Sequence, residues 1–230
     1  STAIIVLARA PQLGRVKTRL IPALGEQGAL DLYRAMLWHA LKIAHQWRAD
    51  ELILACTPSV EHPQLKSMGK AVQATLQVQC GADIGERMHH ALLTALARHQ
   101  VALLIGSDCP SLCRADLDDA RARLVFDERT DGVRGGKNLN GTSATPPPQM
   151  VFIPASDGGY VLVGSTNPCA EIFQKMPWGT GEVMNVTRRR LRARSINWQE
   201  LQPHTDIDRA DDLVKLPDDL RKIFYVAPNF

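Results

Sequence analysis

Five short, continuous apolar segments recur along the chain. They are Ile4–Ala8, Leu52–Cys56, Val101–Ile105, Met150–Ile153 and Tyr160–Val163. Uninterrupted apolar runs of this length are typical of strands that are covered on both faces. We therefore expect a central sheet that is sandwiched between helices.

The segments between these runs carry apolar residues three or four positions apart. This spacing predicts amphipathic helices over Glu26–Trp47 and Gly85–Arg98, and a third helix over Arg114–Val125. Asp83, followed three residues later by Glu86, resembles a capping box at the start of the second helix. Strands that alternate with helices predict an α/β fold whose sheet is largely parallel and built from βαβ crossovers.

The length of 230 residues fits one large α/β domain, and we expect residues 1–230 to form a single domain. Residues 127–149 depart from the pattern, because they contain Gly-Gly, Asn-Gly and three consecutive prolines with almost no apolar side chains. We expect a surface-loop insertion there. A functional lid and a tolerated insertion are both compatible with this composition.

Composition narrows the class of protein. A formal net charge of +3 gives no general affinity for nucleic acid, and 45% hydrophobic residues suffice for a large core. The five cysteines form no C-x-x-C pair, which favours reduced thiols. The run Ile4–Ala8 is too short for a signal peptide or a membrane span, so we expect a cytoplasmic protein without membrane contact.

The first candidate site is the loop Pro11–Arg19, which follows the first apolar run. Ligands of parallel sheets bind beyond the carboxyl ends of the strands, where this loop begins. Backbone amides near Gly14, together with Arg15, Lys17 and Arg19, would form a cradle for phosphate. The spacing is not that of a Walker loop. A solvated basic turn accounts for these residues equally well.

Asp108 is the second candidate, because it follows the buried run Val101–Ile105 almost directly. A carboxylate at this edge suits Mg²⁺, which takes one or two protein carboxylates and fills its other positions with phosphate oxygens and water. A cap of the following helix is the alternative role for this side chain.

Two further acidic segments remain open between structural and functional roles. The segment Asp157-Gly158-Gly159-Tyr160 has the composition of a tight hairpin, and it would also let backbone approach a substrate closely. Asp206 and Asp208 alternate on an extended segment, so both carboxylates could face a metal. Asp208 is also suited to cap a short helix.

The order of these blocks resembles one superfamily from end to end. P-x-x-G-x-V-K-T-R-L, G-S-D-C-P-S-L, S-D-G-G-Y, P-W-G-T and D-I-D-x-x-x-D-L follow one another over roughly residues 3 to 215. This order is similar to that of the nucleotide-diphospho-sugar transferases, which have the glycosyltransferase-A fold. The nearest likeness is to a bacterial branch labelled as glycosyltransferases associated with radical-SAM, selenium or arsenosugar gene clusters.

The resemblance implies a three-layer α/β/α domain, Rossmann-like, with a mixed, mostly parallel sheet and a divalent cation, Mg²⁺ or Mn²⁺. Asp108 matches the metal-binding acid of the superfamily, and Asp206 and Asp208 match a D-x-D that supplies further metal ligands. Lys17 and Arg19 match the segment that wraps nucleotide phosphates, and with Asp108 they are the predicted catalytic residues. The predicted nucleotide- and substrate-binding residues are Ala8, Pro11, Gly14, Arg15, Lys17, Arg19, Ser107, Asp157, Gly158, Gly159 and Tyr160.

The resemblance implies a transferase that binds a nucleotide or nucleotide-sugar and a small-molecule acceptor. The charge of Arg15, Lys17 and Arg19, and a likeness to the guanylyltransferases that activate phospholactate, favour nucleotidyl transfer from a nucleoside triphosphate. The branch label favours glycosyl transfer, and a catalytically silent nucleotide-binding domain is the third possibility. Gly179 stands where the branch has serine in a W-S-T triplet, which leaves acceptor specificity open.

Overall fold

All five apolar runs form strands of one sheet in the computed structural model, which describes residues 1–125 and 147–225. The strands are β1 (Thr2–Arg9), β2 (Glu51–Thr57), β3 (Thr75–Val78), β4 (Val101–Ile105), β5 (Met150–Pro154), β6 (Tyr160–Ser165) and β7 (Trp198–Glu200). The sequence pattern did not predict β3 and β7. Both are short and partly exposed edge strands, so neither carries the continuous apolar run of a covered strand.

The strand order is β3-β2-β1-β4-β6-β5-β7. Most neighbouring pairs are parallel, whereas β6 runs antiparallel to both β4 and β5. The central strand β1 pairs with β2 and β4 in step, so that Ile5 lies opposite Ile53 on one side and Leu104 on the other. The predicted α/β fold with a mixed, mostly parallel sheet is confirmed.

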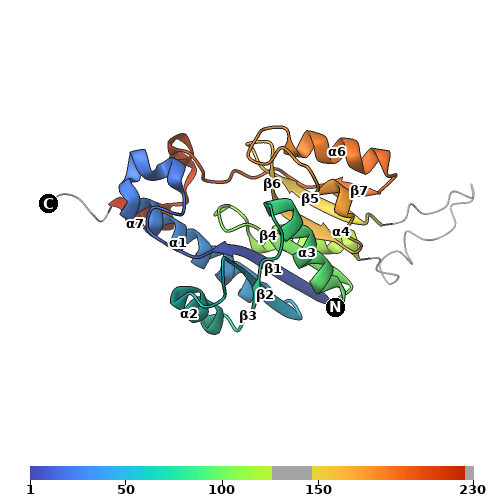
Figure 1. The fold of residues 1–230 in the computed structure, drawn as a ribbon, viewed down its shortest axis with the longest axis horizontal. Coiled ribbons are helices and arrows are strands. Elements are labelled where there is room, and N and C mark those ends of the chain that lie inside the picture. Colours follow the sequence, from blue (N-terminus) through green and yellow to red (C-terminus); the bar gives the residue numbers. More distant parts are fainter. Residues whose placement is uncertain (126–146, 226–230) are drawn as a thin grey trace, which may run out of the picture.

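Helices cover both faces of the sheet (Figure 1). The α-helices are α1 (Ile21–Trp47), α2 (Pro63–Ala71), α3 (Ile84–Leu96), α4 (Arg114–Leu124), α6 (Val183–Ala193) and α7 (Asp218–Tyr225). Three short 3₁₀ segments accompany them: η1 (Thr18–Leu20), η2 (Ala170–Ile172) and η3 (Ala210–Lys215). Alternate side chains of β1 separate the core: Ile4 and Val6 pack with α1, α2 and α4, whereas Ala3 and Ile5 pack with α3 and α6.

The ends of the helices follow local signals. The capping box predicted at Asp83 is half formed: the amide of Glu86 donates to Asp83 Oδ1 over 2.8 Å, whereas Glu86 Oε2 accepts from the amide of Ala82 over 2.8 Å instead of from that of Asp83. The first helix begins at Ile21 instead of Glu26, because a helical turn precedes Gly25, whose φ of 69° and ψ of 170° interrupt the helix.

Most of the predicted insertion at 127–149 lies outside the described residues, which resume at residue 147. Among the helices that the structure describes, none is both long and apolar enough to cross a membrane.

We expect Phe152→Ala to lower the free energy of unfolding by about 3–5 kcal/mol, because it leaves a cavity in the core beside Tyr160. Phe152 is 0% exposed, and its ring centroid lies 5.4 Å from that of Tyr160. Urea denaturation followed by circular dichroism measures the change. Val214→Ala is the control, because Val214 is 74% exposed, and its expected change is below about 0.5 kcal/mol. Equal losses for the two variants would contradict this packing.

Candidate functional site

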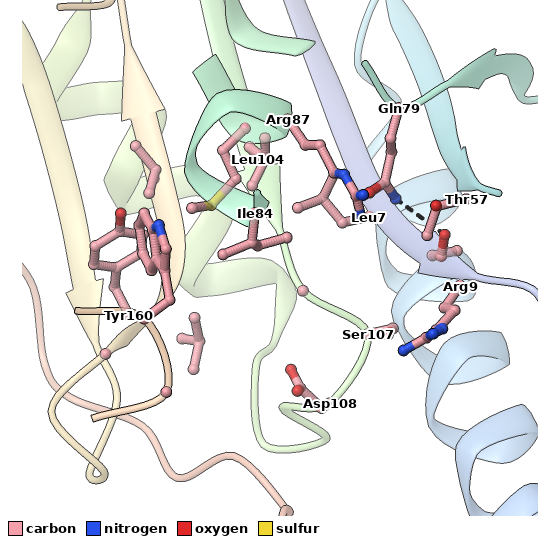
Figure 2. A pocket seen from close by; sticks show the side chains of 18 of the residues that line it. Leu7, Arg9, Thr57, Gln79, Ile84, Arg87, Leu104, Ser107, Asp108 and Tyr160 are labelled. Atoms are coloured by element: carbon pink, nitrogen blue, oxygen red, sulfur yellow. Dashed lines mark hydrogen bonds between the residues drawn. The ribbon is translucent and has the colours of Figure 1, made fainter. Parts of the chain in front are cut away.

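A pocket of about 820 Å³ lies where the carboxyl ends of the parallel strands meet. Its wall is formed by Arg9 at the end of β1, Thr57 at the end of β2, Gln79 after β3 and Ser107 after β4. Tyr160, at the start of the antiparallel strand β6, closes the opposite side (Figure 2). The pocket therefore occupies the edge of the sheet where ligands of α/β proteins bind.

Asp108 projects into this pocket from the turn after β4 (Figure 2). The preceding Gly106 accommodates it, since a Cβ at residue 106 would lie 2.8 Å from Asp108 Oδ1. The alternative role of Asp108 as a helix cap is wrong, because Cys113 is the N-cap of α4. Asp108 is therefore available to a ligand.

Three arginines line the pocket: Arg9, Arg15 and Arg87. In residues 1–125 and 147–225, none of their guanidinium groups forms an ion pair. Uncompensated guanidinium groups gathered in one cavity favour an anionic ligand, and their forked donors suit phosphate oxygens.

Lys17 and Arg19 are placed differently, since both are ion-paired with acidic residues. Lys17 Nζ lies 3.2 Å from Asp108 Oδ2 and 3.6 Å from Asp208 Oδ1, and the Lys17 side chain is only 7% exposed. Arg19 Nη1 lies 2.6 Å from Asp208 Oδ2. Burial acts to lower the pKa of Lys17, but the carboxylates of Asp108 and Asp208 outweigh it and raise that pKa above 10.5. The ammonium therefore stays charged and balances these carboxylates.

The C-terminal segment brings Asp206 next to Asp108. The amide of Ile207 donates to the carbonyl of Asp108 over 2.9 Å, which pins the two segments together. Burial, followed by the charges of Asp157 and Asp108, raises the pKa of Asp206 to about 6. The negative charges of Asp108 and Asp157, which lie in distant parts of the chain, therefore both disfavour ionisation of Asp206.

A second network holds this C-terminal segment in place. His204 Nδ1 lies 2.9 Å from Ser111 Oγ, and its Nε2 lies 3.1 Å from Asp116 Oδ1.

The alternative role of Asp208 as a helix cap is wrong, since η3 begins at Ala210 and the carboxylate of Asp212 accepts from the backbone amides at its start.

The hairpin and the substrate-facing roles of Asp157–Tyr160 are compatible in the structure. The segment connects the antiparallel strands β5 and β6, and Asp157 Oδ1 accepts from the amide of Gly159 over 2.9 Å. A Cβ at Gly158 would lie 2.2 Å from the carbonyl oxygen of Gly181, so glycine is required there. Asp157, Gly159 and Tyr160 also line the pocket.

Seven of the predicted site residues line the pocket: Ala8, Arg15, Ser107, Asp108, Asp157, Gly159 and Tyr160. Seven do not contribute to its wall: Pro11, Gly14, Lys17, Arg19, Gly158, Asp206 and Asp208. Of the latter, Lys17 and Asp206 act on Asp108 through charge.

Sequence reasoning missed Arg9, Gln79, Arg87 and Trp178 as pocket residues. Arg9 could have been found, because it directly follows the run Ile4–Ala8 at the edge where ligands bind. Gln79 could not, because the edge strand that delivers it lacks an apolar pattern. Arg87 was read only as part of the helix behind the capping box.

The fold defines the chain as an α/β protein of the nucleotide-diphospho-sugar transferase type. It belongs to the family described as "Uncharacterized protein conserved in bacteria (DUF2064)", whose model matches residues 40–180. No curated protein matches it.

Solved structures give the same picture of the fold. A protein from Desulfovibrio desulfuricans G20, provisionally assigned as a nucleotide-diphospho-sugar transferase, is similar with a TM-score of 0.72 and 25% identity over 90% of this chain and 82% of that chain. 4-Diphosphocytidyl-2C-methyl-D-erythritol synthase from Anaerococcus prevotii DSM 20548 reaches a TM-score of 0.55 at 10% identity, covering 93% of each chain.

A third neighbour is glucosyl-3-phosphoglycerate synthase from Mycobacterium tuberculosis, solved with Mg²⁺ and uridine diphosphate. Its TM-score is 0.52 at 12% identity, over 93% of this chain and 74% of that chain. These neighbours include nucleotidyltransferases and glycosyltransferases, in agreement with the prediction of a transferase.

We expect Lys17→Met to destabilise the fold by about 1–3 kcal/mol at neutral pH, because Asp108 and Asp208 lose their buried counter-charge. The figure lies at the low end for a buried pair because both carboxylates are about a third exposed, at 39% and 30%. Lys42→Met, which removes an exposed lysine of α1, is the control. Chemical denaturation of both variants measures the difference.

The pH dependence of this effect has a defined sign. The folded-state pKa of Lys17 is raised above 10.5, so its contribution is fully present below pH 10.5 and is lost as the pH rises through the folded-state value. The stability difference between wild type and Lys17→Met should therefore be constant from pH 7 to 10 and shrink at higher pH. A difference that grows above pH 10.5 would contradict the ion pair.

Proposed function

We propose that the chain is a nucleotide-dependent transferase that holds the phosphates of its donor between Arg9, Arg15 and Asp108. One observation carries the proposal: Arg9 and Arg15 line the same pocket as Asp108, and among the described residues neither of the two has an acidic partner. A nucleoside triphosphate or nucleotide-sugar supplies the negative charge that these cations lack. The likeness to the Desulfovibrio protein supports the same class of donor.

A divalent cation suits the acidic side of this pocket. Burial, followed by the charges of Asp157 and Asp108, raises the pKa of Asp206, and a hard cation bound by oxygen would offset the repulsion among these carboxylates. The described residues contain no ready-made group of three metal-holding side chains. Mg²⁺ is commonly bound by one or two protein carboxylates, with phosphate oxygens and water in its other positions.

Asp108 and Asp206 would hold this cation, and Asp208 is the weaker candidate because Lys17 and Arg19 already pair with it. The cation would supply Lewis-acid stabilisation of the phosphate charge. Arg9 and Arg15 would orient the phosphates and stabilise the charge that builds on them in the transition state. Lys17, which pairs with Asp108, would keep that carboxylate in place.

Nucleotidyl transfer is the reaction we favour. An acceptor oxygen would attack the α-phosphorus of a nucleoside triphosphate, and the bond to the bridging oxygen would break to release pyrophosphate. Arg9, Arg15 and the divalent cation together provide more positive charge than a diphosphate requires, and the likeness of the Pro11–Arg19 block to phospholactate guanylyltransferases points the same way. The acceptor would bind beside Tyr160, which lies on the other side of Asp108 from Arg9 (Figure 2). Asp157 also lines the pocket, as does Trp178, whose ring centroid lies 6.2 Å from that of Tyr160.

Glycosyl transfer from a nucleotide-sugar is the second candidate. The order of the sequence blocks supports membership of the bacterial branch labelled as glycosyltransferases. The pocket volume of about 820 Å³ also leaves room for a sugar beside the nucleotide. The two reactions differ in what leaves the donor, since glycosyl transfer releases a nucleoside diphosphate.

Product analysis separates these reactions. The protein is incubated with Mg²⁺, a panel of nucleoside triphosphates and nucleotide-sugars, and small phosphorylated or hydroxylated acceptors. We expect release of pyrophosphate from a triphosphate, whereas release of a nucleoside diphosphate from a nucleotide-sugar would establish glycosyl transfer. Binding of nucleotide without either product would favour a catalytically silent domain.

We expect Asp108→Ala to lower kcat by at least about 10²–10³-fold while the protein stays folded. The matched control is Asp119→Asn, because Asp119 is an exposed aspartate of α4 that pairs only with Arg123 in the described structure. Steady-state kinetics at saturating Mg²⁺, with circular dichroism of both variants, gives the comparison. Near-normal turnover by a folded Asp108→Ala protein would remove Asp108 from the mechanism.

A further inference from the structure

Gln79 and Arg87 form a polar end of the pocket that the proposed chemistry does not use. Both residues line the pocket, and Figure 2 shows their side chains pointing toward one another near Leu7, away from Asp108. They come from adjacent segments, since Gln79 follows β3 and Arg87 lies in the first turn of α3. A ligand whose phosphates lie at Asp108 would place the part farthest from its phosphates at this end.

The orientation of the Gln79 carboxamide is fixed by the backbone. Its Nε2 donates to the carbonyl oxygens of Ala8 over 3.0 Å and of Ala55 over 2.7 Å. The reverse orientation would set Oε1 against two carbonyl oxygens, so the network admits one orientation of the amide. In the part of the chain that the structure describes, Oε1 accepts no hydrogen bond, and it remains as an acceptor for a ligand.

Arg87 is held by the same segment. Its Nε donates to the carbonyl of Gly81 over 3.0 Å. Gly81 has a φ of 139°, and a Cβ there would lie 2.6 Å from Glu86 Cβ, so glycine is needed for this close approach to α3. The two terminal guanidinium nitrogens have no partner within residues 1–125 and 147–225. They offer a fork of donors beside the acceptor of Gln79.

Apolar side chains flank this polar pair. Leu7 and Ile84 line the same end of the pocket, and Ile84 is 38% exposed despite being apolar. An exposed apolar surface next to oriented polar atoms suits a flat ring, which packs its faces on the aliphatic groups and presents its edge to the polar ones. A nucleobase has this shape.

We propose that Gln79 and Arg87 read the edge of the nucleotide's base and select guanine or cytosine over adenine and uracil. Arg87 would donate to two adjacent acceptors, and Gln79 Oε1 would accept from the donor next to them. Guanine presents N7 and O6 followed by N1–H, and cytosine presents O2 and N3 followed by the N4 amino group. The edges of adenine and uracil present an acceptor, a donor and an acceptor in turn. The two donors of Arg87 would therefore face one donor of the base, which cannot accept a hydrogen bond.

This inference rests on the proposed nucleotide-dependent transferase, and it adds the identity of the base. Isothermal titration calorimetry of the full chain with GTP, CTP, ATP and UTP in the presence of Mg²⁺ tests it. We expect GTP or CTP to bind on the order of tenfold or more tightly than ATP and UTP. If GTP is the ligand, inosine triphosphate should bind similarly, because it keeps N7, O6 and N1–H.

Arg87→Lys separates base reading from general attraction of phosphate, because it keeps the positive charge and loses the fork. We expect this variant to bind GTP or CTP no more than a few-fold better than ATP, with its affinity for ATP nearly unchanged. Gln79→Met, of similar length without polar atoms, should also lose the preference. Arg189→Lys, an exposed position of α6, should keep it. Melting temperatures without nucleotide verify that each variant is folded.

Equal binding of all four nucleotides by the wild type would overturn the base selection and leave the proposed transferase intact. A preference that survives in Arg87→Lys would likewise overturn the assignment of Arg87. Binding of none of the nucleotides, with Mg²⁺ present, would instead remove the proposed function itself.

Discussion

The in-step parallel pairing of β1 with β2 and β4 is the constraint on which the site depends. β1 and β2 end together, since Arg9 lies opposite Thr57, and β4 ends three residues earlier, where Ile105 lies opposite Val6. Residues about fifty positions apart in the chain, such as Arg9, Thr57 and Ser107, therefore meet at one edge of the sheet. Buried apolar side chains on both faces fix this pairing, since a strand that shifted by one residue would move each of its own side chains to the opposite face.

The antiparallel strand β6 completes this edge from the other side. Because β6 runs antiparallel to β4, its first residue, Tyr160, lies at the edge where β4 ends. The β5–β6 hairpin then brings Asp157 to the pocket, and the C-terminal segment follows along β5, where the amides of Leu201 and His204 donate to the carbonyls of Phe152 and Pro154. One edge of the sheet thus collects groups from both halves of the chain.

Charge is distributed unevenly within this site, and the distribution separates two roles. Lys17 forms ion pairs with Asp108 and Asp208, and Arg19 forms one with Asp208. Their first effect is therefore to hold the acidic segments together. Arg9, Arg15 and Arg87 lack acidic partners in the described structure and are free to attract an anion. A count of basic residues in the Pro11–Arg19 loop could not separate the two groups, because pairing depends on residues about 90 and 190 positions away.

The sequence by itself determined the five covered strands, three of the helices and the edge at which chemistry would lie. The five apolar runs predicted five strands, Asp83 and Glu86 marked a helix start, and Asp108 after a buried run marked the pocket. These features are local, since strand burial and capping depend on near neighbours in the chain. Tertiary structure alone decided the edge strand β3, which has no apolar run, and with it the place of Gln79 beside Arg87. It also decided that Lys17 faces Asp108 and not the open pocket, because the energy of an ion pair depends on a distance that only the folded chain defines.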